Sequence, residues 1–462
     1  AATCTSCHGV HDIRSLADPE ASIAGRQVPA TCSKCHVDEG AAYTASIHWK
    51  AYEMGVRKAP VCNDCHLEHA ILPPSTPESP VSHFQVPTTC AGCHANEQLI
   101  RRYGLASFRV ESFYSSYHGL ALRSGGAEVA NCSSCHGAHE IRAASDSLSM
   151  VHPANLVGTC GSCHPGIGEQ VVIGTIHGAP PGASGRIIAL VRGIYIWVII
   201  VLVGGMLLHN GLDFRKKVIS GDHGPVSQSD RSPTIVRFNT VERALHWSTL
   251  LSFTILAWSG FGLAYPESFL AAVWDEAVRR LVHRAAAVVL LSAMALQVIL
   301  FAATTRGRSQ FRALFPGLKD LQDARHMFKY FFGRRRHRPP FGRFSYIEKF
   351  EYWALIWGIV IMGVTGVGLW FQNQTLQLLP KWWLDLFTVI HFYEAVLASL
   401  AIVVWHFYWV IFDPEVYPGS GVFWHGKISP DRLRHEHPLE WERLEREGSP
   451  QPGRSKHGTP GS

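Results

Sequence analysis

The sequence predicts an all-α membrane protein with five transmembrane helices, preceded by a domain that contains little regular secondary structure. Long apolar runs are confined to residues from about 187 to 412, whereas the first 180 residues are polar and rich in Cys, His, Gly and Pro. All twelve cysteines lie in those first 180 residues, and each belongs to a C-x-x-C-H motif. A chain of 462 residues has room for two or three domains.

Five apolar segments are each about 20 residues long, which is enough to cross a bilayer as a helix. We predict a separate first transmembrane helix at residues 187–209 and a main transmembrane domain at residues 235–412. The helices of this domain are expected at residues 242–264, 281–302, 351–371 and 387–412. Pro180 and Pro181 belong to a linker that follows the first domain, residues 1–180. Residues 413–462 form a charged tail, and the composition of residues 449–462 is typical of disorder.

The cysteine motifs predict the chemistry of the first domain. C-x-x-C-H is the signature of c-type haem attachment, in which two thiols bond to the porphyrin and the adjacent His becomes the proximal iron ligand. A single motif would also suit half of a zinc site or a redox dithiol. Six motifs with no cysteine left over make these alternatives, and a disulfide framework, negligible. The predicted thioether cysteines are Cys4, Cys7, Cys32, Cys35, Cys62, Cys65, Cys90, Cys93, Cys132, Cys135, Cys160 and Cys163, and the predicted proximal ligands are His8, His36, His66, His94, His136 and His164.

An internal repeat organises these six predicted haem c sites. Four positions recur with a shift of 70 residues, and the matched pairs are His48 and His118, Cys62 and Cys132, His66 and His136, and His69 and His139. Each unit has a first motif C-x-x-C-H, then a lone His, then a second motif C-x-x-C-H-x-x-H. The segment from Cys4 to His11 is similar to the second motif of an earlier unit, which leads us to expect further sequence before Ala1.

Six haems need six distal ligands if every iron is six-coordinate. Six histidines stand at positions of the repeat or of its partial units: His11, His48, His69, His118, His139 and His177. His83 and His152, each shortly before a C-x-x-C-H motif, are spare candidates. Met54 and Met150 do not recur with the repeat, so we predict bis-His ligation and low redox potentials, because a Met ligand raises the potential. The sequence does not say which distal histidine serves which haem.

The positive charges predict the orientation in the membrane. Lys and Arg gather in residues 213–245 and 303–350, whereas residues 265–280 and 372–386 contain few. Because cytoplasmic loops carry an excess of Lys and Arg, the first two segments and the C-terminus are expected to be cytoplasmic. The cysteine-rich domain is then periplasmic, as haem c attachment requires, and the protein is expected in a bacterial inner membrane. No basic and aromatic patch suggests a nucleic-acid partner.

Four histidines in the predicted spans pair by depth. His391 and His406 lie on one helix, roughly 22 Å apart along its axis and on similar faces. His406 and His246 are near cytoplasmic ends of spans, and His391 and His283 near periplasmic ends. Helix bundles hold cofactors between facing side chains, and ionisable residues in a membrane are functional candidates by default. We predict a four-helix bundle with two haem b groups, one on His246 and His406 and one on His283 and His391, and an interfacial or quinone-site role for His209.

Residues from about 235 to 412 resemble the di-haem cytochrome b subunits of formate dehydrogenase-N and of membrane-bound nickel–iron hydrogenases. The resemblance is carried by RALHW around His246, LVHRA around His283, the EKFEYW segment, and the paired His391 and His406. It implies the same haem pairing and a menaquinone site beside the cytoplasmic-side haem.

FSYIEKFEYW is similar to a family segment that reaches the quinone site. The resemblance implies Ser345, Glu348 and Lys349 as quinone-site candidates, although the family often has Asn at the position of Ser345. An amphipathic helix start at the membrane interface would explain the same segment. The additional first helix and the fused multihaem domain are similar to inner-membrane quinol-oxidising multihaem cytochromes.

These features favour a quinol:cytochrome electron-transfer protein embedded in membrane lipid. Menaquinol would be oxidised near the cytoplasmic-side haem b, with Glu348 and His209 as candidate proton acceptors, and electrons would pass through two haem b and six haem c groups to a periplasmic electron-transfer protein. The alternative is a membrane anchor in a complex with a periplasmic catalytic subunit, which would reduce the quinone pool. Small-molecule reduction at a c haem needs an open iron position, and six distal candidates argue against it.

We expect a spectral titration to count two haem b and six haem c groups per chain. His391→Ala should remove one haem b, because the substitution removes an axial ligand. The absence of a b-type signal, or two haem b groups in the variant, would contradict the predicted membrane site.

Overall fold

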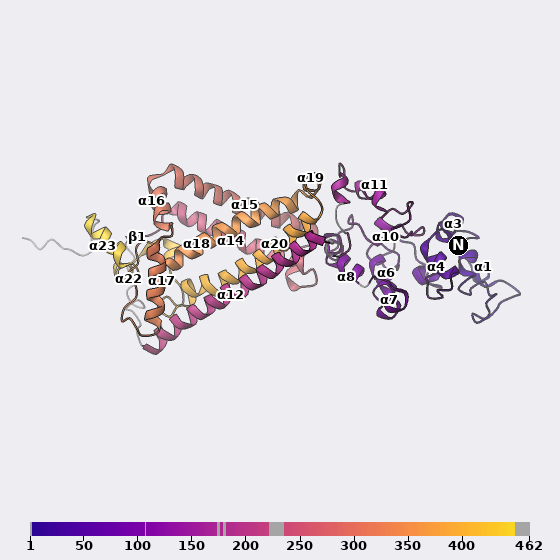
Figure 1. The fold of residues 1–462 in the computed structure, drawn as a ribbon, viewed down its shortest axis with the longest axis horizontal. Helices are drawn as coiled ribbons and strands as arrows, with labels where there is room; N and C mark the ends of the chain where they lie inside the picture. The colour runs from indigo at the N-terminus through magenta and orange to yellow at the C-terminus, as the bar shows by residue number, and fades with distance from the viewer. Residues whose placement is uncertain (1, 107, 173–175, 179–181, 221–234, 449–462) are drawn as a thin grey trace, which may run out of the picture. The chain divides into compact units, whose positions relative to one another are not determined.

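The computed structural model describes residues 2–106, 108–172, 176–178, 182–220 and 235–448. The predicted linker prolines, Pro180 and Pro181, and the predicted disordered end, residues 449–462, lie outside the described residues. The described chain is mostly helical (Figure 1). It divides into two compact units, of which the first comprises residues 1–187, 258–281 and 369–386, and the second comprises residues 188–257, 282–368 and 387–462.

The first unit consists mainly of short helices joined by irregular segments. These helices are α1 (Cys4–His8), α2 (Val28–Cys32), α3 (Val37–Thr44), α4 (Ile47–Glu53), α5 (Cys62–His66), α6 (Val86–His94), α7 (Glu97–Tyr103), α8 (Phe108–Tyr114), α9 (Tyr117–Arg123), α10 (Cys132–His136), η1 (Pro153–Asn155), α11 (Leu156–Gly161), η2 (Glu169–Val171), η3 (Phe269–Ala271) and α19 (Gln372–Leu378). The sequence predicted little regular secondary structure for this domain, whereas the structure has short helices around the cysteine motifs.

The second motif of each unit folds into a helix of its own, namely α1, α5 or α10. In each helix, the residue before the second cysteine accepts a hydrogen bond from the backbone N–H that precedes the first cysteine. These bonds are Thr3 N to Ser6 Oγ at 3.1 Å, Val61 N to Asp64 Oδ2 at 2.7 Å, and Asn131 N to Ser134 Oγ at 3.1 Å. Such caps satisfy backbone donors at a helix start. The local sequence thus holds two cysteines and a histidine on one helical turn.

Apolar packing in the first unit is limited to small clusters. One cluster consists of Val28, Tyr43, Tyr52 and Val61, and another of Ile167, Val171 and Leu376. All twelve cysteines are free and at least partly exposed. A domain of this length usually buries a larger apolar core, so the polypeptide alone supplies little of the hydrophobic stabilisation that the unit needs.

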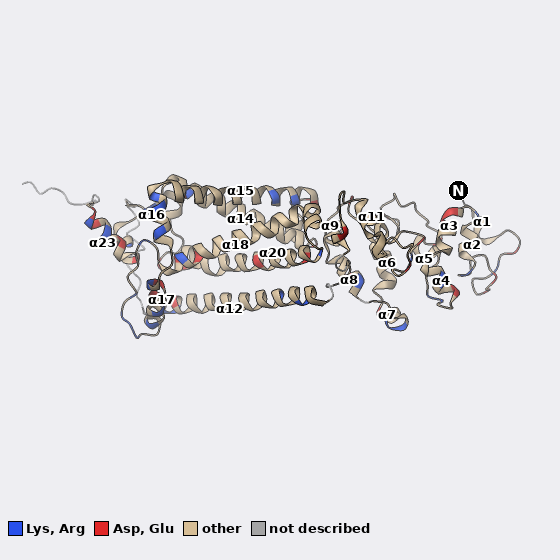
Figure 2. Cartoon of the chain, turned by 45° about the horizontal axis from the view of Figure 1, so that its top comes forward, with Lys and Arg blue, Asp and Glu red and all other residues tan. Residues whose placement is uncertain are grey.

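Five helices in the described part of the chain are long and apolar enough to cross a membrane. They are α12 (Gly182–Ser220), α14 (Thr240–Ala264), α15 (Glu276–Ala303), α18 (Tyr346–Trp370) and α20 (Trp382–Ala401), which continues through η4 (Ile402–His406) and η5 (Tyr408–Phe412). Within the second unit these helices run side by side (Figure 1), and they carry few charged residues along most of their length (Figure 2). Each predicted span is therefore found as a helix.

The last span differs from the predicted regular α-helix. Residues Ile402–His406 and Tyr408–Phe412 are π-helical. A π-helical turn interrupts the usual backbone ladder, and such turns are frequent at functional sites. Here the carbonyl of Val404 accepts a hydrogen bond from the side-chain amide of Asn210 at 2.6 Å, so α12 contacts this irregular segment directly.

The first span is longer than predicted, because α12 continues past His209 to Ser220. Asp213 and Lys217, four residues apart, form an ion pair at 2.7 Å and are each only 1% exposed. Lys217 also contacts Asp413 at 2.6 Å and Glu415 at 3.5 Å. This buried ion cluster attaches the end of α12 to the residues that follow the last span.

Glu415 has a second cationic partner, Arg338, whose guanidinium donates to both carboxylate oxygens at 2.7 and 2.8 Å. Burial by itself would raise the pKa of Glu415. Hydrogen bonds from His435 and Arg338, with the charge of Lys217, instead hold that pKa well below its ordinary value. Glu415 is therefore ionised at neutral pH and contributes a fixed negative charge to the cluster.

Residues after the last span are folded rather than only a charged tail. β1 (Ile235–Val236) pairs antiparallel with β2 (Lys427–Ile428), with Ile235 opposite Ile428. Three helices surround β2: α21 (Val422–His425), α22 (Pro430–Glu436) and α23 (Pro438–Arg446). Val422, Ile428 and Leu433 form a buried cluster here. Two further helices, α16 (Thr305–Leu314) and α17 (Leu318–Phe331), lie between α15 and α18 in the chain.

We predict that Lys217→Met destabilises the protein by about 3–5 kcal/mol, because it leaves the carboxylates of Asp213 and Asp413 buried without their cation. Thermal unfolding of the detergent-solubilised protein would measure the loss. Arg215→Met is the matched control, since it removes a positive charge from an exposed position of the same helix. Equal unfolding temperatures for the two variants would contradict the structural role of the ion cluster.

Candidate functional site

Two pairs of imidazoles face each other inside the second unit. His246 of α14 lies opposite His406 of η4, with ring centres 6.4 Å apart. His283 of α15 lies opposite His391 of α20, also at 6.4 Å. The sequence predicted the same two pairs from the expected depth of each histidine in the membrane. The helices thus bring together all four residues proposed as haem b ligands.

The separation within each pair suits an iron ion between the rings. Metal–imidazole bonds of about 2.0 Å on opposite sides of one iron place the ring centres roughly 6 Å apart. Imidazoles in direct stacking contact would be closer. No cluster of three or more His, Cys, Asp or Glu side chains that could hold a bare metal ion occurs among the described residues. The four histidines therefore fit two haem groups better than a metal bound by side chains alone.

Side chains of α18 hydrogen-bond one ring of each pair, His391 and His406. The hydroxyl of Thr365 donates to the carbonyl of Ile361 at 2.7 Å, and its oxygen lies 2.9 Å from Nδ1 of His391. The hydroxyl oxygen can then accept from Nδ1–H, which leaves Nε2 unprotonated for iron. A side chain at Gly366 would come within 3.3 Å of the His391 ring. Glu351 hydrogen-bonds Nδ1 of His406 in the same manner.

Sequence reasoning missed Thr365 and Glu351 as orienting residues. Each is distant in sequence from the histidine that it contacts. Glu351 does belong to the EKFEYW segment, so its acidic character at the start of a span was a usable signal. Thr365 offered none, because threonine within an apolar helix commonly bonds its own backbone.

Among the described residues of the first unit, five imidazole pairs have nearly the same separation. The pairs are His8 with His69 at 6.3 Å, His48 with His94 at 6.3 Å, His66 with His139 at 6.1 Å, His118 with His164 at 6.2 Å, and His136 with His177 at 6.2 Å. Every pair joins one predicted proximal ligand to one predicted distal ligand. The residues therefore fit bis-His haem c groups at five of the six cysteine motifs.

Hydrogen bonds orient some of these rings as well. Nδ1 of His164 lies 2.8 Å from the side-chain oxygen of Asn373, and Nδ1 of His177 lies 3.2 Å from the hydroxyl of Ser112. Ligand histidines commonly use their second ring nitrogen in this way. Both contacts involve Nδ1, which leaves Nε2 as the nitrogen that could bind iron.

The remaining predicted ligands are placed differently. Neither His11 nor His36 faces another imidazole at such a separation among the described residues. The spare candidates have local roles: His83 contacts the side chain of Asn131 at 3.4 Å, and Nδ1 of His152 accepts from the backbone of Ala154 at 3.3 Å. The prediction that His11 completes one of the six sites thus finds no geometric support.

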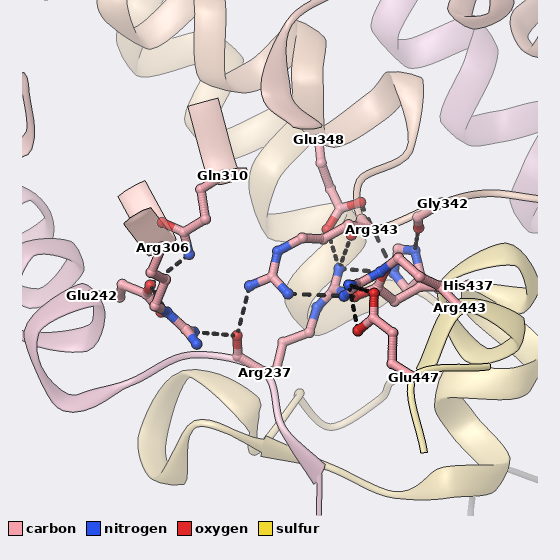
Figure 3. Close-up of polar contacts among 11 residues, drawn as sticks. Arg237, Glu242, Arg306, Gln310, Gly342, Arg343, Glu348, His437, Arg443 and Glu447 are labelled. Atoms are coloured by element: carbon pink, nitrogen blue, oxygen red, sulfur yellow. Dashed lines mark hydrogen bonds and ion pairs between the residues drawn. The ribbon is translucent and has the colours of Figure 1, made fainter. Parts of the chain in front are cut away.

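The quinone-site candidates lie at the start of α18 in contacts with other side chains. Ser345 donates from its backbone N–H to Glu348 at 2.7 Å, as in a helix cap. Lys349 donates to Asp320 of α17 at 3.0 Å. Glu348 is 36% exposed and lies 3.4 Å from the guanidinium of Arg237 (Figure 3). Glu348 is therefore the one carboxylate among the three candidates, and its side chain is partly exposed.

His437 completes this polar group (Figure 3). Burial, followed by the charge of Arg237, lowers the pKa of His437. The neutral ring donates from Nδ1 to the carbonyl of Gly342 at 2.7 Å, and its Nε2 lies 3.2 Å from the Arg237 guanidinium, from which it can accept. Arg237 thus links the start of α18 to the start of α23.

His209 of α12 lies in an aromatic enclosure that the sequence did not predict. Its Nε2 is 2.6 Å from the hydroxyl of Tyr346, and the rings of Trp405 and Trp409 lie 5.1 and 5.9 Å from its own. Its Nδ1 and the indole nitrogens of both tryptophans are buried without a hydrogen-bond partner among the described residues. Unpaired buried donors are costly, so this group can accept a further polar ligand.

Residues 237–418 match the family model described as prokaryotic cytochrome b561. The matched range includes all four histidines of the two pairs in the second unit, whereas the cysteine motifs and α12 precede it. No match was found among curated proteins. The family match and the five apolar helices indicate an integral membrane protein, with haem b binding and membrane electron transfer as the activity of the matched region.

We predict that Glu351→Gln raises the redox potential of the haem at His246 and His406 by about 60 mV, which corresponds to a tenfold change for a one-electron couple. The carboxylate makes His406 a more basic ligand and favours ferric iron, and the amide does not. A spectroelectrochemical titration of the two haem b groups would measure the shift. Thr365→Val is the matched control at the other pair, and equal shifts of both haem b groups in Glu351→Gln would contradict the assignment.

Proposed function

Because residues 237–418 match the prokaryotic cytochrome b561 model, we propose that the chain is a membrane quinol:cytochrome electron-transfer protein. It oxidises menaquinol near the His246–His406 pair and delivers electrons, by way of two haem b and six haem c groups, to a periplasmic acceptor protein. One menaquinol releases two electrons and two protons, and it therefore reduces two one-electron acceptors.

A single observation carries this proposal: the same imidazole separation, 6.1 to 6.4 Å, occurs at both pairs in the second unit and at five cysteine motifs in the first. An enzyme that acts on a small molecule at iron would need an open coordination position. A series of closed bis-His sites instead suits electron transfer without bond chemistry at the metal. Haem bound at these sites supplies reversible one-electron redox chemistry.

The residues of the chain hold and tune these groups. The paired imidazoles would hold each iron between them and would keep water away from it. The carboxylate of Glu351 makes His406 the more basic ligand, whereas the hydroxyl of Thr365 leaves His391 less basic. This difference favours a lower potential at the His246–His406 pair, which supports electron movement from that pair toward the His283–His391 pair.

The quinol is proposed to bind near His406, at the start of α18. Ser345, Glu348 and Lys349 are the contact candidates, and Glu348 supplies the carboxylate that is proposed to accept a proton. The unpaired donors around His209 offer hydrogen bonds to a quinone oxygen. The excess of Lys and Arg in residues 303–350 supports a cytoplasmic location for this end, and a periplasmic location for the cysteine-rich domain.

We expect the purified chain to oxidise a menaquinol analogue and to reduce a soluble c-type cytochrome without another subunit. Glu348→Gln should slow this turnover at least tenfold, because it removes the proposed proton acceptor, while dithionite still reduces every haem. Glu442→Gln, at an exposed position of α23, is the control. Activity only with a co-purifying catalytic subunit would instead identify a membrane anchor that reduces quinone.

A further inference from the structure

The imidazole pairs of the first unit follow a rule that connects neighbouring repeats. The proximal histidine of a second motif pairs with the x-x-H histidine of the next second motif along the chain. His8 pairs with His69 in this way, and His66 pairs with His139. Each second-motif haem would therefore be shared between two successive units.

The first motifs follow the opposite direction. The proximal histidine of a first motif pairs with the lone histidine of the unit before it. His94 pairs with His48, and His164 pairs with His118, at the same interval in the sequence. Each sequence repeat thus supplies its x-x-H histidine to the second motif of the preceding repeat. It supplies its lone histidine to the first motif of the following repeat.

The array closes itself at the end that precedes α12. No second motif follows His164, so no x-x-H histidine can serve His136. His177 takes this place, at 6.2 Å from His136. The last second-motif proximal histidine, His136, is therefore paired within the described residues by a histidine from outside the rule.

His11 and His36 lie at the other end of the array and are unmatched. His36 is a first-motif proximal histidine and calls for a lone histidine from the unit before. His11 is an x-x-H histidine and is suited to the second-motif haem of the unit before. The two residues have different roles in the rule, so one does not complete the other.

The surroundings of His36 agree with this interpretation. The side chain of His36 is 72% exposed, and its nearest charged contact is Glu39 at 3.9 Å. The other five proximal histidines are half-buried. His11 is also exposed. Both imidazoles are thus accessible to a partner.

We propose that the first unit carries a coordination junction, formed by His36 and His11, for further c-type repeat sequence. The haem at Cys32 and Cys35 takes its sixth ligand from a lone histidine at the position that precedes a second motif such as Cys4–His11, and His11 ligates the second-motif haem of the repeat unit one step earlier. The partner is a multihaem c-type segment with the same repeat, belonging either to the same polypeptide or to a second molecule. The proposal rests on the haem c assignment given under the proposed function.

Carbon monoxide is the probe, because it binds ferrous haem only at an open axial position. The reduced chain of residues 1–462, in detergent, should bind one carbon monoxide per six c haems. His69→Ala should raise this number to two, because His69 serves His8 within the chain. His11→Ala, the same substitution in the equivalent motif, should leave it at one. The visible spectrum of the carbon monoxide complex gives the count independently of turnover.

The opposite pattern overturns the junction. If the chain binds no carbon monoxide and His11→Ala binds one, then His11 closes the His36 site within the chain. A methionine-to-iron charge-transfer band in the oxidised chain would assign that site to Met54 or Met150 and would equally reject the proposal. A separate count of covalently bound haem distinguishes these results from failure of the proposed function. The carbon monoxide test is interpreted only for protein that contains six covalent haems.

The source of the partner is resolved on protein purified from native membranes. No carbon monoxide binding together with a polypeptide heavier than residues 1–462 would assign the further unit to the same chain. If the native protein binds no carbon monoxide, but binds one after a co-purifying c-type cytochrome has been removed, the further repeat sequence belongs to a second molecule. Binding of one carbon monoxide by the intact native complex would reject the junction.

Discussion

The distance between paired imidazoles is the constraint on which the rest of the structure depends. Seven pairs hold nearly the same separation although they come from different helices and meet at different ring angles. An iron ion tolerates only a narrow range of bond lengths, whereas the rotation of each ring about the axial direction is less restricted. The fold therefore keeps the distance between the paired ring centres nearly constant, whereas local packing sets the angle between the ring planes.

The two units meet this constraint by different means. In the second unit, apolar helices position the histidines, and α18 supplies Thr365 and Glu351 to fix the ring orientation. In the first unit, five-residue helices hold the three second motifs, and little apolar core surrounds them. α12 adds a buried ion cluster around Lys217, which joins the end of the first span to the segment after the last one.

The sequence predicted those features that depend on covalent chemistry or on regular geometry. C-x-x-C-H spacing identified the proposed attachment sites, and the rise of an α-helix was sufficient to pair His246 with His406 and His283 with His391. It did not predict the π-helical turn, which accompanies a contact with Asn210 about two hundred residues away. The strand pairing and the buried cluster after Asp413 were not predicted, because Val422, Ile428 and Leu433 show no periodic apolar pattern. His11 was included in the ligand count because recurrence gives the number of ligands but not their partners.

The exchange of histidines between successive units has a consequence for how the domain is assembled. In the proposed haem c assignment, no repeat unit can complete its own iron sites, so each depends on its neighbours for a finished coordination shell. Stability in such an array resides in the connections between units more than in the units themselves. Loss of one internal unit would leave an incomplete site on both sides of the gap. Under that assignment, maturation is a cooperative process: covalent attachment places each haem in its motif, and the exchanged histidines set which repeat units are neighbours.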